Sequence, residues 1–505
     1  MRAEKAFRNI LYDYIGNILT VIISFVSKTV FIYTLGQEYL GLSGLFSNVL
    51  SVLSLAELGI GSAITFELYK PLAENNNKAI QQLMQFYKKA YQIIGWVIAG
   101  IGIIIIPILK YIVNFDEDVA INYIAIYVLF LINSVFSYLF FAYKATILYA
   151  SQKKYLTKKI EYKATIIQTL LQVIVLFVFH NYYIYLIIGI VRSIIQNFLV
   201  AQKADTLYPI LKEATRKSLP KQTKDKIREN TIALSLYKVS GVVLNATDNI
   251  VISTFISTTV LASYSLYNYL SITIKGFWAI IFDSFVAAIG DFNVVEENKR
   301  KKEIFDVLYY LSFILYGLAS IGLIQASSDF IQLWVGKQYL LSQRTLWLMT
   351  GAFLIAGLEN ATYVFRTGCG LYDIAKYRPV CSTIVNVVVS VILANFIGID
   401  GVFIGTIISR LVTYWIVDPK VVYKYILCCS VKDYYTKWFQ YISVTVITVA
   451  ISQMLNNLIP SVNWVFLILK VCYGEMIFIT LIVAIYWNKN ENKYLLKTIK
   501  RLLKR

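Results

Sequence analysis

Charged residues, histidine and organised cysteine are all scarce in this chain of 505 residues. Charged residues make up 15% of it, against about 25% in typical soluble domains. The single histidine, His180, is expected at a helix end and cannot form a metal site alone. The cysteines show neither metal-ligand nor disulfide-framework spacing, so we interpret them as reduced packing residues and expect no metal and no cofactor. They are Cys369, Cys381, Cys428, Cys429 and Cys472.

The sequence also lacks a nucleotide-binding motif and a large loop. No G-x-x-x-x-G-K-[ST] motif occurs, so we expect no ATP hydrolysis by the chain itself. The first ten residues, MRAEKAFRNI, lead into an apolar segment without a small-residue cleavage site, which argues against a cleaved signal peptide. The longest predicted outside loop lies near 327–343 and has about 17 residues. We therefore predict a transporter and not an enzyme.

What the chain has in abundance is apolar sequence. Hydrophobic residues make up 58% of it, too much for one soluble core of this size. The apolar runs are near 20 residues long, which matches a bilayer core of about 30 Å. The sequence predicts an all-α polytopic membrane protein with fourteen transmembrane helices. The predicted spans are 10–35, 41–66, 87–109, 119–143, 160–179, 183–203, 231–256, 259–290, 305–326, 344–366, 379–397, 401–418, 436–457 and 462–487.

The formal net charge of +19 has an orderly distribution along the chain. With a cytoplasmic N-terminus, nearly all Lys and Arg residues lie in inside segments, as the positive-inside rule requires. Only Lys110, Lys337 and Arg344 lie outside, and the outside loop 114–118 reads NFDED. We therefore expect a multi-pass membrane protein with both termini cytoplasmic. Anionic membrane lipid accounts for the charge, and no nucleic-acid partner is needed.

The second half of the chain repeats the first at an offset of about 220 residues. GLFSNVLSVL at 44–53 matches SLYNYLSITI at 265–274, and two further matches keep the order and nearly the same spacing. Two parallel six-helix units would place a substrate path between them. The predicted divisions are 1–203 for the N-lobe with helices one to six, 204–230 for a basic cytoplasmic linker, 231–424 for the C-lobe with helices seven to twelve, and 425–505 for helices thirteen and fourteen and the basic tail.

Charged side chains inside the predicted spans are the candidate site residues. One charge at mid-bilayer costs about 2.5–3.5 kcal/mol on insertion scales. Cations on repeat-related helices would converge on one cavity and bind substrate; the alternative is that each forms a local salt bridge. The predicted substrate-binding cations are Lys28, Arg192, Lys238, Lys275 and Arg410. The acidic residues are candidates for proton or sodium coupling, or else neutralise a nearby cation: Asp13, Glu57, Asp248 and Asp283.

The sign of these charges indicates the kind of substrate. A drug-sized organic cation would prefer acidic and aromatic walls. A diphosphate needs Arg and Lys donors, because charge-assisted bonds replace its lost water. Several cations in one cavity therefore favour an anionic substrate with a large hydrophilic part, such as the headgroup of a lipid-linked sugar.

One long segment also resembles a known family. Residues 34–74, TLGQEYLGLSGLFSNVLSVLSLAELGIGSAITFELYKPLAE, resemble the first two helices of polysaccharide-export (Wzx-type) flippases. These belong to the multidrug/oligosaccharidyl-lipid/polysaccharide (MOP) exporter superfamily. The six-plus-six repeat and two extra helices extend the resemblance over essentially the whole chain. It implies a MOP/MATE-like fold of two six-helix lobes forming a V, plus two extra C-terminal helices.

The resemblance also implies a function. An undecaprenyl-pyrophosphate-linked oligosaccharide repeat unit would cross from the cytoplasmic to the outer leaflet by alternating access, for capsule, O-antigen or exopolysaccharide synthesis. Related lipid II flippases use cationic cavity residues and bind the lipid tail along helices thirteen and fourteen. The coupling ion would be H+ or Na+. Two alternatives remain: an ion-coupled multidrug antiporter of the same superfamily, and a membrane glycan polymerase or ligase.

Overall fold

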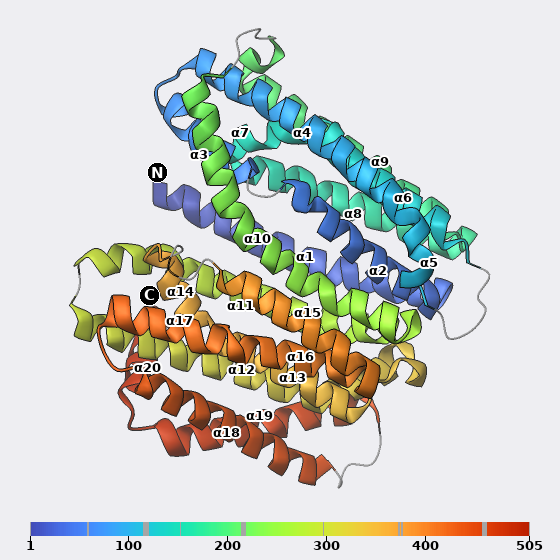
Figure 1. Cartoon of the computed structure of the whole chain (residues 1–505). Coiled ribbons are helices and arrows are strands. Elements are labelled where there is room, and N and C mark those ends of the chain that lie inside the picture. Colours follow the sequence, from blue (N-terminus) through green and yellow to red (C-terminus); the bar gives the residue numbers. More distant parts are fainter. Residues whose placement is uncertain are drawn as a thin grey trace. The chain divides into compact units, whose positions relative to one another are not determined.

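The computed structural model describes residues 2–57, 60–114, 121–151, 153–213, 219–295, 297–371, 374, 377–456 and 462–503. In these ranges the ordered elements are all helical, as the composition predicts. Contacts divide the chain into two compact units, Met1–Ala262 and Ser263–Arg505. Figure 1 shows the long helices that make up both units.

The first unit contains ten complete helices among its described residues, joined by short turns. The 3-10 turns are η1 (Ser54–Glu57), η2 (Ile106–Ile108), η3 (Ala142–Lys144) and η4 (Pro209–Lys212). The α-helices are α1 (Arg2–Leu35), α2 (Gln37–Leu53), α3 (Ile60–Ala73), α4 (Asn77–Ile105), α5 (Leu109–Ile112), α6 (Tyr123–Leu139), α7 (Ala145–Ala150), α8 (Lys154–Phe179), α9 (Tyr182–Leu207) and α10 (Lys221–Phe255).

Helix packing in the first unit joins segments that are distant in sequence. The α1 helix packs on α8, α8 on α9, and α4 and α9 both pack on α6. The α10 helix, which the repeat assigns to the second bundle, packs on α2 and α3 and falls in this unit. The division of the chain into two six-helix lobes and a linker stays a prediction.

The second unit continues from α11 (Thr258–Val295), which spans the unit boundary. Its shorter elements are the 3-10 turn η5 (Lys337–Tyr339) and the π-helical turn η7 (Tyr423–Leu427). Its remaining α-helices are α12 (Asn298–Val335), α13 (Gln343–Leu358), α14 (Asn360–Gly368), α15 (Arg378–Ile397), α16 (Ile399–Val412), α17 (Tyr414–Val422), α18 (Lys432–Asn456), α19 (Trp464–Tyr486) and α20 (Asn490–Leu503).

Aromatic rings form the centre of the second unit. Phe313 of α12 stacks on Tyr441 of α18, with ring centroids 4.2 Å apart and an interplanar angle of 6°. Tyr309 stacks on Tyr434 at 4.8 Å. Buried aromatic pairs of this kind contribute about 0.5–1.5 kcal/mol beyond their buried area. They hold α18 against α12, and α19 also packs on α12.

Eleven helices of the described chain are long and apolar enough to cross a membrane. The bent pair of α6 with the segment Ala142–Ala150, which turns by 47°, makes up to twelve. Phe141, in the left-handed region at φ 60°, stands at this bend. Large apolar side chains such as Trp96 and Phe177 are exposed on long helices, which indicates contact with lipid. The protein is a multi-pass helical membrane protein.

The predicted number of fourteen spans is not confirmed. The expected span 41–66 is divided among α2, η1 and α3, and neither α-helix reaches 18 residues. The expected span 231–256 falls in α10, whose first turns carry many charged residues. Neither region is among the spans that pass by length and composition.

Side-chain caps define several helix starts. The side-chain oxygen of each N-cap residue accepts a hydrogen bond from a backbone N–H three residues later, and such a cap contributes about 1 kcal/mol. The capping residues are Asn76, Asn122, Asn181, Ser342 and Asn463. His180 ends α8 in the left-handed conformation, so its predicted place at a helix end is confirmed.

Candidate functional site

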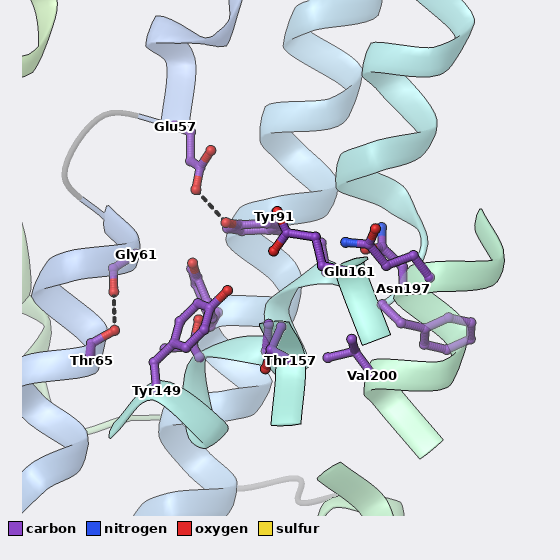
Figure 2. Close-up of a pocket in the computed structure, with 15 residues that line it drawn as sticks. Glu57, Gly61, Thr65, Tyr91, Tyr149, Thr157, Glu161, Asn197 and Val200 are labelled. Carbon is purple, nitrogen blue, oxygen red and sulfur yellow. Dashed lines mark hydrogen bonds between the residues drawn. The ribbon is translucent and has the colours of Figure 1, made fainter. Parts of the chain in front are cut away.

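The first unit contains a polar cavity of about 350 Å³ (Figure 2). Its wall is built by the end of η1, by α3, α4, η3 and α7, and by α8 and α9. Five separate stretches of the chain therefore meet at one site inside a single unit. The lining residues are Glu57, Gly61, Thr65, Tyr87, Tyr91, Phe141, Ala142, Ala145, Thr146, Tyr149, Thr157, Glu161, Gln196, Asn197 and Val200.

Glu57 is the predicted coupling residue that lies in this cavity. Tyr91 donates a hydrogen bond from its hydroxyl to Glu57 Oε1, as Figure 2 shows. The ring of Tyr91 meets that of Tyr87 edge to face, with centroids 4.5 Å apart. The hydroxyl of Tyr138 also hydrogen-bonds to Glu57. A carboxylate that accepts from two phenols still has acceptor capacity for a proton or a cation.

Two other oxygen atoms of the cavity have no hydrogen-bond partner in the described part of the chain. Thr157 is 3% exposed, and its Oγ1 has no hydrogen-bond partner among the described residues. The Oε1 atom of Gln196 is also buried without one. Glu161 is paired with Lys158 at 2.9 Å at the start of α8. Buried polar atoms are normally hydrogen-bonded, so these two oxygens indicate that the cavity is hydrated or holds a polar ligand.

The second unit buries a cluster of ionic side chains. Arg410 Nη1 lies 2.7 Å from Glu359 Oε2. Asp418 forms an ion pair with Arg378 and lies 3.6 Å from the Nε atom of Arg366. Asp418 and these two arginines are only 3–5% exposed. The cluster connects α14, α15, α16 and α17 through charges that lipid cannot stabilise.

The cluster holds more positive than negative charge. Three arginines face two acids, and the ring of Tyr414 lies 4.1 Å from the guanidinium carbon of Arg378 and 5.5 Å from that of Arg410. Contacts with an aromatic face stabilise a desolvated guanidinium. The arrangement can hold an additional anion near Arg410, the most exposed of the three arginines at 26%.

The five predicted substrate-binding cations have different surroundings. Lys28 is half-buried on α1, and Arg192 Nη2 donates to Thr165 Oγ1 at 2.8 Å. Lys275 lies 5.3 Å from the centre of the Phe353 ring. Lys275 and Arg410 both interact electrostatically with Glu359, so the second unit brings these two together. The side chain of Lys238 lies outside the described part of the chain.

The predicted acidic residues also differ. Besides Glu57, Asp248 is half-buried on α10. Asp283 is exposed and accepts a hydrogen bond from the hydroxyl of Tyr363 at 3.3 Å. The side chain of Asp13 lies outside the described part. Among these four acids, Glu57 is the one that the structure places in a polar cavity.

Sequence reasoning missed several charged residues of both sites. Arg410 pairs with Glu359, an acid that the sequence analysis did not consider, because it stands at the junction of α13 and α14. Arg410, Tyr414 and Asp418 follow each other at steps of four, which would have placed them on one helical face. The other missed residues are Tyr91, Glu161, Arg366 and Arg378.

An apolar groove of about 460 Å³ lies in the second unit, between α11, α12 and α19. Leu270 and Trp278 line it from α11, Leu318 and Phe330 from α12, and Val471 from α19. Helix α19 is one of the two predicted extra helices. A groove of this composition accommodates an apolar chain.

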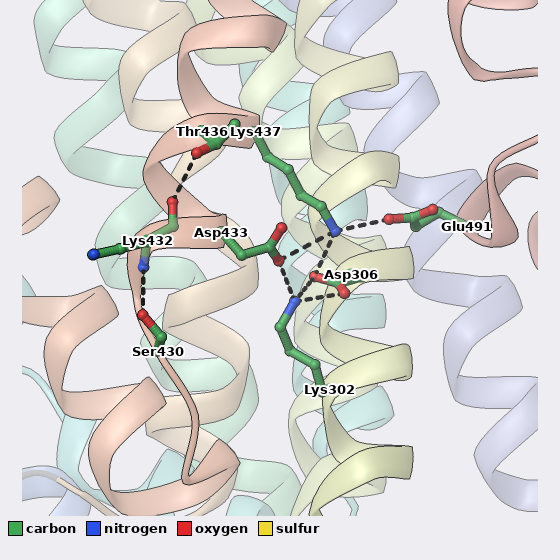
Figure 3. A network of polar contacts seen from close by, with 8 residues as sticks. All are labelled: Lys302, Asp306, Ser430, Lys432, Asp433, Thr436, Lys437 and Glu491. Carbon is green, nitrogen blue, oxygen red and sulfur yellow. Dashed lines mark hydrogen bonds and ion pairs between the residues drawn. The ribbon is translucent and has the colours of Figure 1, made fainter.

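A network of five charged side chains links α12, α18 and α20 of this unit (Figure 3). Lys302 of α12 lies 2.5 Å from both Asp306 and Asp433. Lys437 of α18 lies 2.8 Å from Glu491 of α20 and 3.1 Å from Asp306. Burial alone would raise the pKa of Glu491, but the hydrogen bond and charge of Lys437 outweigh it and lower that pKa. The network holds α20 and α18 on α12.

Comparison with known proteins gives a likeness of fold. No family model matches the sequence, and no curated protein matches it. Among solved structures, the lipid II flippase MurJ in an inward closed conformation matches with a TM-score of 0.67 at 14% identity. That match covers 95% of this chain and 99% of MurJ. The chain has the fold of MOP-superfamily transporters. The MOP/MATE-like fold predicted from the sequence is therefore confirmed.

Two transporters of the MATE family share the fold. A MATE transporter of the MOP superfamily in an inward-facing conformation matches with a TM-score of 0.59 at 13% identity, covering 81% of this chain and 96% of its own. A mutant of the Vibrio cholerae MATE transporter VcmN matches with a TM-score of 0.55 at 14% identity, and the match covers 84% of this chain and 98% of VcmN. Both matches cover a smaller share of this chain than the match to MurJ does.

Proposed function

We propose that this protein is a flippase for a lipid-linked oligosaccharide. It moves an undecaprenyl-pyrophosphate-linked repeat unit from the cytoplasmic to the outer leaflet of a bacterial cytoplasmic membrane, by alternating access, for the synthesis of a surface polysaccharide. The fold of MOP-superfamily transporters supports the transport activity. The likeness to a lipid II flippase over 95% of the chain supports a lipid-linked substrate.

The observation that carries the proposal is the apolar groove that α19 makes with α11 and α12. The two MATE matches cover 81% and 84% of the chain. The part of the chain that each leaves unmatched is about as long as its C-terminal helices. A lipid tail bound in this groove would stay in an apolar environment while the polar headgroup crosses the membrane. A water-soluble drug has no need of such a groove.

The proposed headgroup contacts are the five cations. Lys28, Arg192, Lys238, Lys275 and Arg410 bind the pyrophosphate or acidic sugars. Arg192 supports this role, because its Nε atom is buried without a hydrogen-bond partner among the described residues. Glu359 holds Arg410 in place and is shared with Lys275.

The proposed coupling residue is Glu57, with Asp13, Asp248 and Asp283 as further candidates. Protonation of Glu57, or a sodium ion bound beside it, would neutralise the cavity of the first unit. Thr157 and Gln196 supply two unpartnered oxygens to the same cavity, and oxygen atoms are the ligands that hard cations prefer. An H+ or Na+ gradient would thereby return the transporter to its starting state.

The function is tested by deleting the gene and following the lipid-linked oligosaccharide. We expect the precursor to accumulate in the inner leaflet and surface polysaccharide to disappear. Lys275→Ala should fail to restore export at normal protein level, whereas Lys224→Ala, an exposed lysine of α10, should restore it. Normal export by Lys275→Ala would show that this lysine is not a substrate contact.

A multidrug antiporter is the second candidate function. The cavity of the first unit has acidic and aromatic walls, the kind that an organic cation prefers. For this function, deletion would leave the glycan unchanged and make cells hypersensitive to cationic drugs. A glycan polymerase or ligase, the third class, is supported by no feature of the described structure.

A further inference from the structure

A basic cavity of about 670 Å³ lies at the junction of α17 and α18, next to the ionic network of Figure 3. The π-helical turn η7 and the loop before α18 form its wall. The lining residues are Lys420, Tyr423, Lys424, Cys428, Cys429, Ser430 and Val431. No acidic side chain is among them.

The lysines of this cavity carry uncompensated charge. Lys420 and Lys424 are exposed and lie one helical turn apart on α17 and η7. Lys432, also exposed, begins α18. Within the described ranges none of these three lysines forms an ion pair. The cavity therefore attracts anions.

The nearby acids are engaged elsewhere. Asp433, in the first turn of α18, is 2.5 Å from Lys302 and 3.4 Å from Lys437 (Figure 3). Asp306 and Glu491 belong to the same network. These three carboxylates share two lysines, Lys302 and Lys437, which leaves the network one negative charge. The two lysines that line the cavity, Lys420 and Lys424, outweigh it.

One further group can donate a hydrogen bond to an anion here. Tyr423 is 1% exposed, lines the cavity, and its hydroxyl has no hydrogen-bond partner among the described residues. A buried hydroxyl without a partner is costly, and an anion oxygen would satisfy it.

The surroundings indicate that the anion belongs to a lipid. Helix α18 and the run of α16, α17 and η7 are membrane-spanning candidates, and both end at this junction. Tyr425 and Phe439, which are 50% and 57% exposed, present apolar surface beside it. Basic pockets between transmembrane helices at the cytoplasmic side bind anionic headgroups.

We propose that the α17–α18 junction binds the headgroup phosphate of an anionic phospholipid. Lys420 and Lys424 pair with the phosphate, and the hydroxyl of Tyr423 donates a hydrogen bond to it. The acyl chains extend along the exposed apolar surface of α18. The lipid belongs to the leaflet at this end, which the proposed topology makes the inner one. The site is independent of which substrate the protein transports.

The test uses the full chain in phosphatidylcholine nanodiscs, with phosphatidylglycerol as the probe. Retained phosphatidylglycerol is counted by native mass spectrometry, and its affinity is taken from the rise in melting temperature. We expect wild type to retain one tightly bound phosphatidylglycerol. The double variant Lys420→Ala/Lys424→Ala should lose affinity by roughly tenfold or more, since each lysine near a membrane surface contributes to anionic-lipid binding.

Two variants distinguish a specific lipid-binding site from nonspecific electrostatic attraction. Lys489→Ala/Lys493→Ala removes two exposed lysines of the same unit and should keep the bound lipid. Tyr423→Phe removes one hydroxyl and no charge; it should weaken retention several-fold and leave stability in pure phosphatidylcholine unchanged. Equal losses in both double variants, or unchanged retention in Tyr423→Phe, would overturn the proposal. Displacement of the lipid by millimolar inorganic phosphate would overturn the assignment to a phospholipid.

Discussion

Asp418 is expected to be among the acids whose loss destabilises the protein most. Its side chain is 3% exposed and is shared by Arg366 and Arg378, which are 5% and 4% exposed. Asp418→Asn keeps the shape and removes the charge, so two buried guanidinium groups lose their counter-ion. Breaking a buried pair in this way costs about 3–5 kcal/mol. The loss should appear as a lower free energy of unfolding in mixed detergent–SDS titrations.

Asp400 offers a matched control. It pairs with Arg344 at 3.1 Å, but Arg344 is 66% exposed, and exposed pairs contribute about 0–1 kcal/mol. Asn at position 400 can still accept the hydrogen bond from the Thr345 hydroxyl, which is 2.6 Å long in the wild type. Asp400→Asn should therefore cost much less than Asp418→Asn. If the two variants lose stability equally, the burial argument for the arginine cluster is wrong.

Three other predictions concern coupling, pH and packing. Glu57→Gln should abolish the dependence of transport on the ion gradient while passive exchange of substrate persists; unaltered gradient dependence would exclude Glu57 as the coupling group. Lys437 lowers the pKa of Glu491, so this ion pair stabilises α20 fully at a pH above the ordinary Glu pKa of about 4.3. The stabilisation is lost as the pH falls through the lowered pKa. Backbone hydrogen exchange of residues 490–503 should therefore rise in that pH range in the wild type but not in Glu491→Gln. Gly405→Ala should cost about 1–3 kcal/mol, because its Cβ would lie 2.3 Å from the Ser390 hydroxyl, whereas Gly276→Ala meets nothing within 4 Å and should be neutral or stabilising.

The helical membrane fold could be predicted from the sequence because apolar runs of bilayer length have few other uses. The number of membrane spans could not be predicted, because two expected spans mix polar and apolar residues. The span 41–66 breaks at η1, where Glu57 enters the cavity. The α10 helix carries charge into its first turns.

The candidate site was predictable in part. Glu57 and Arg410 stood out because a charge inside an apolar run is rare. Their partners did not: Tyr91 looks like one of 39 tyrosines, and Glu359 marks a helix junction that only the structure shows. The unpartnered oxygen of Thr157 has no signature in sequence, because it depends on what surrounds the side chain.

The most direct test of the proposed function follows the substrate itself across a membrane. The purified protein would be reconstituted in liposomes with a fluorescent undecaprenyl-pyrophosphate-linked oligosaccharide, and a membrane-impermeant quencher would report the exposed fraction. The account predicts that the protected pool becomes accessible with the wild-type protein and stays protected with Lys275→Ala. The account would be contradicted if the protected lipid stayed protected with the wild-type protein while the same liposomes transported an organic cation.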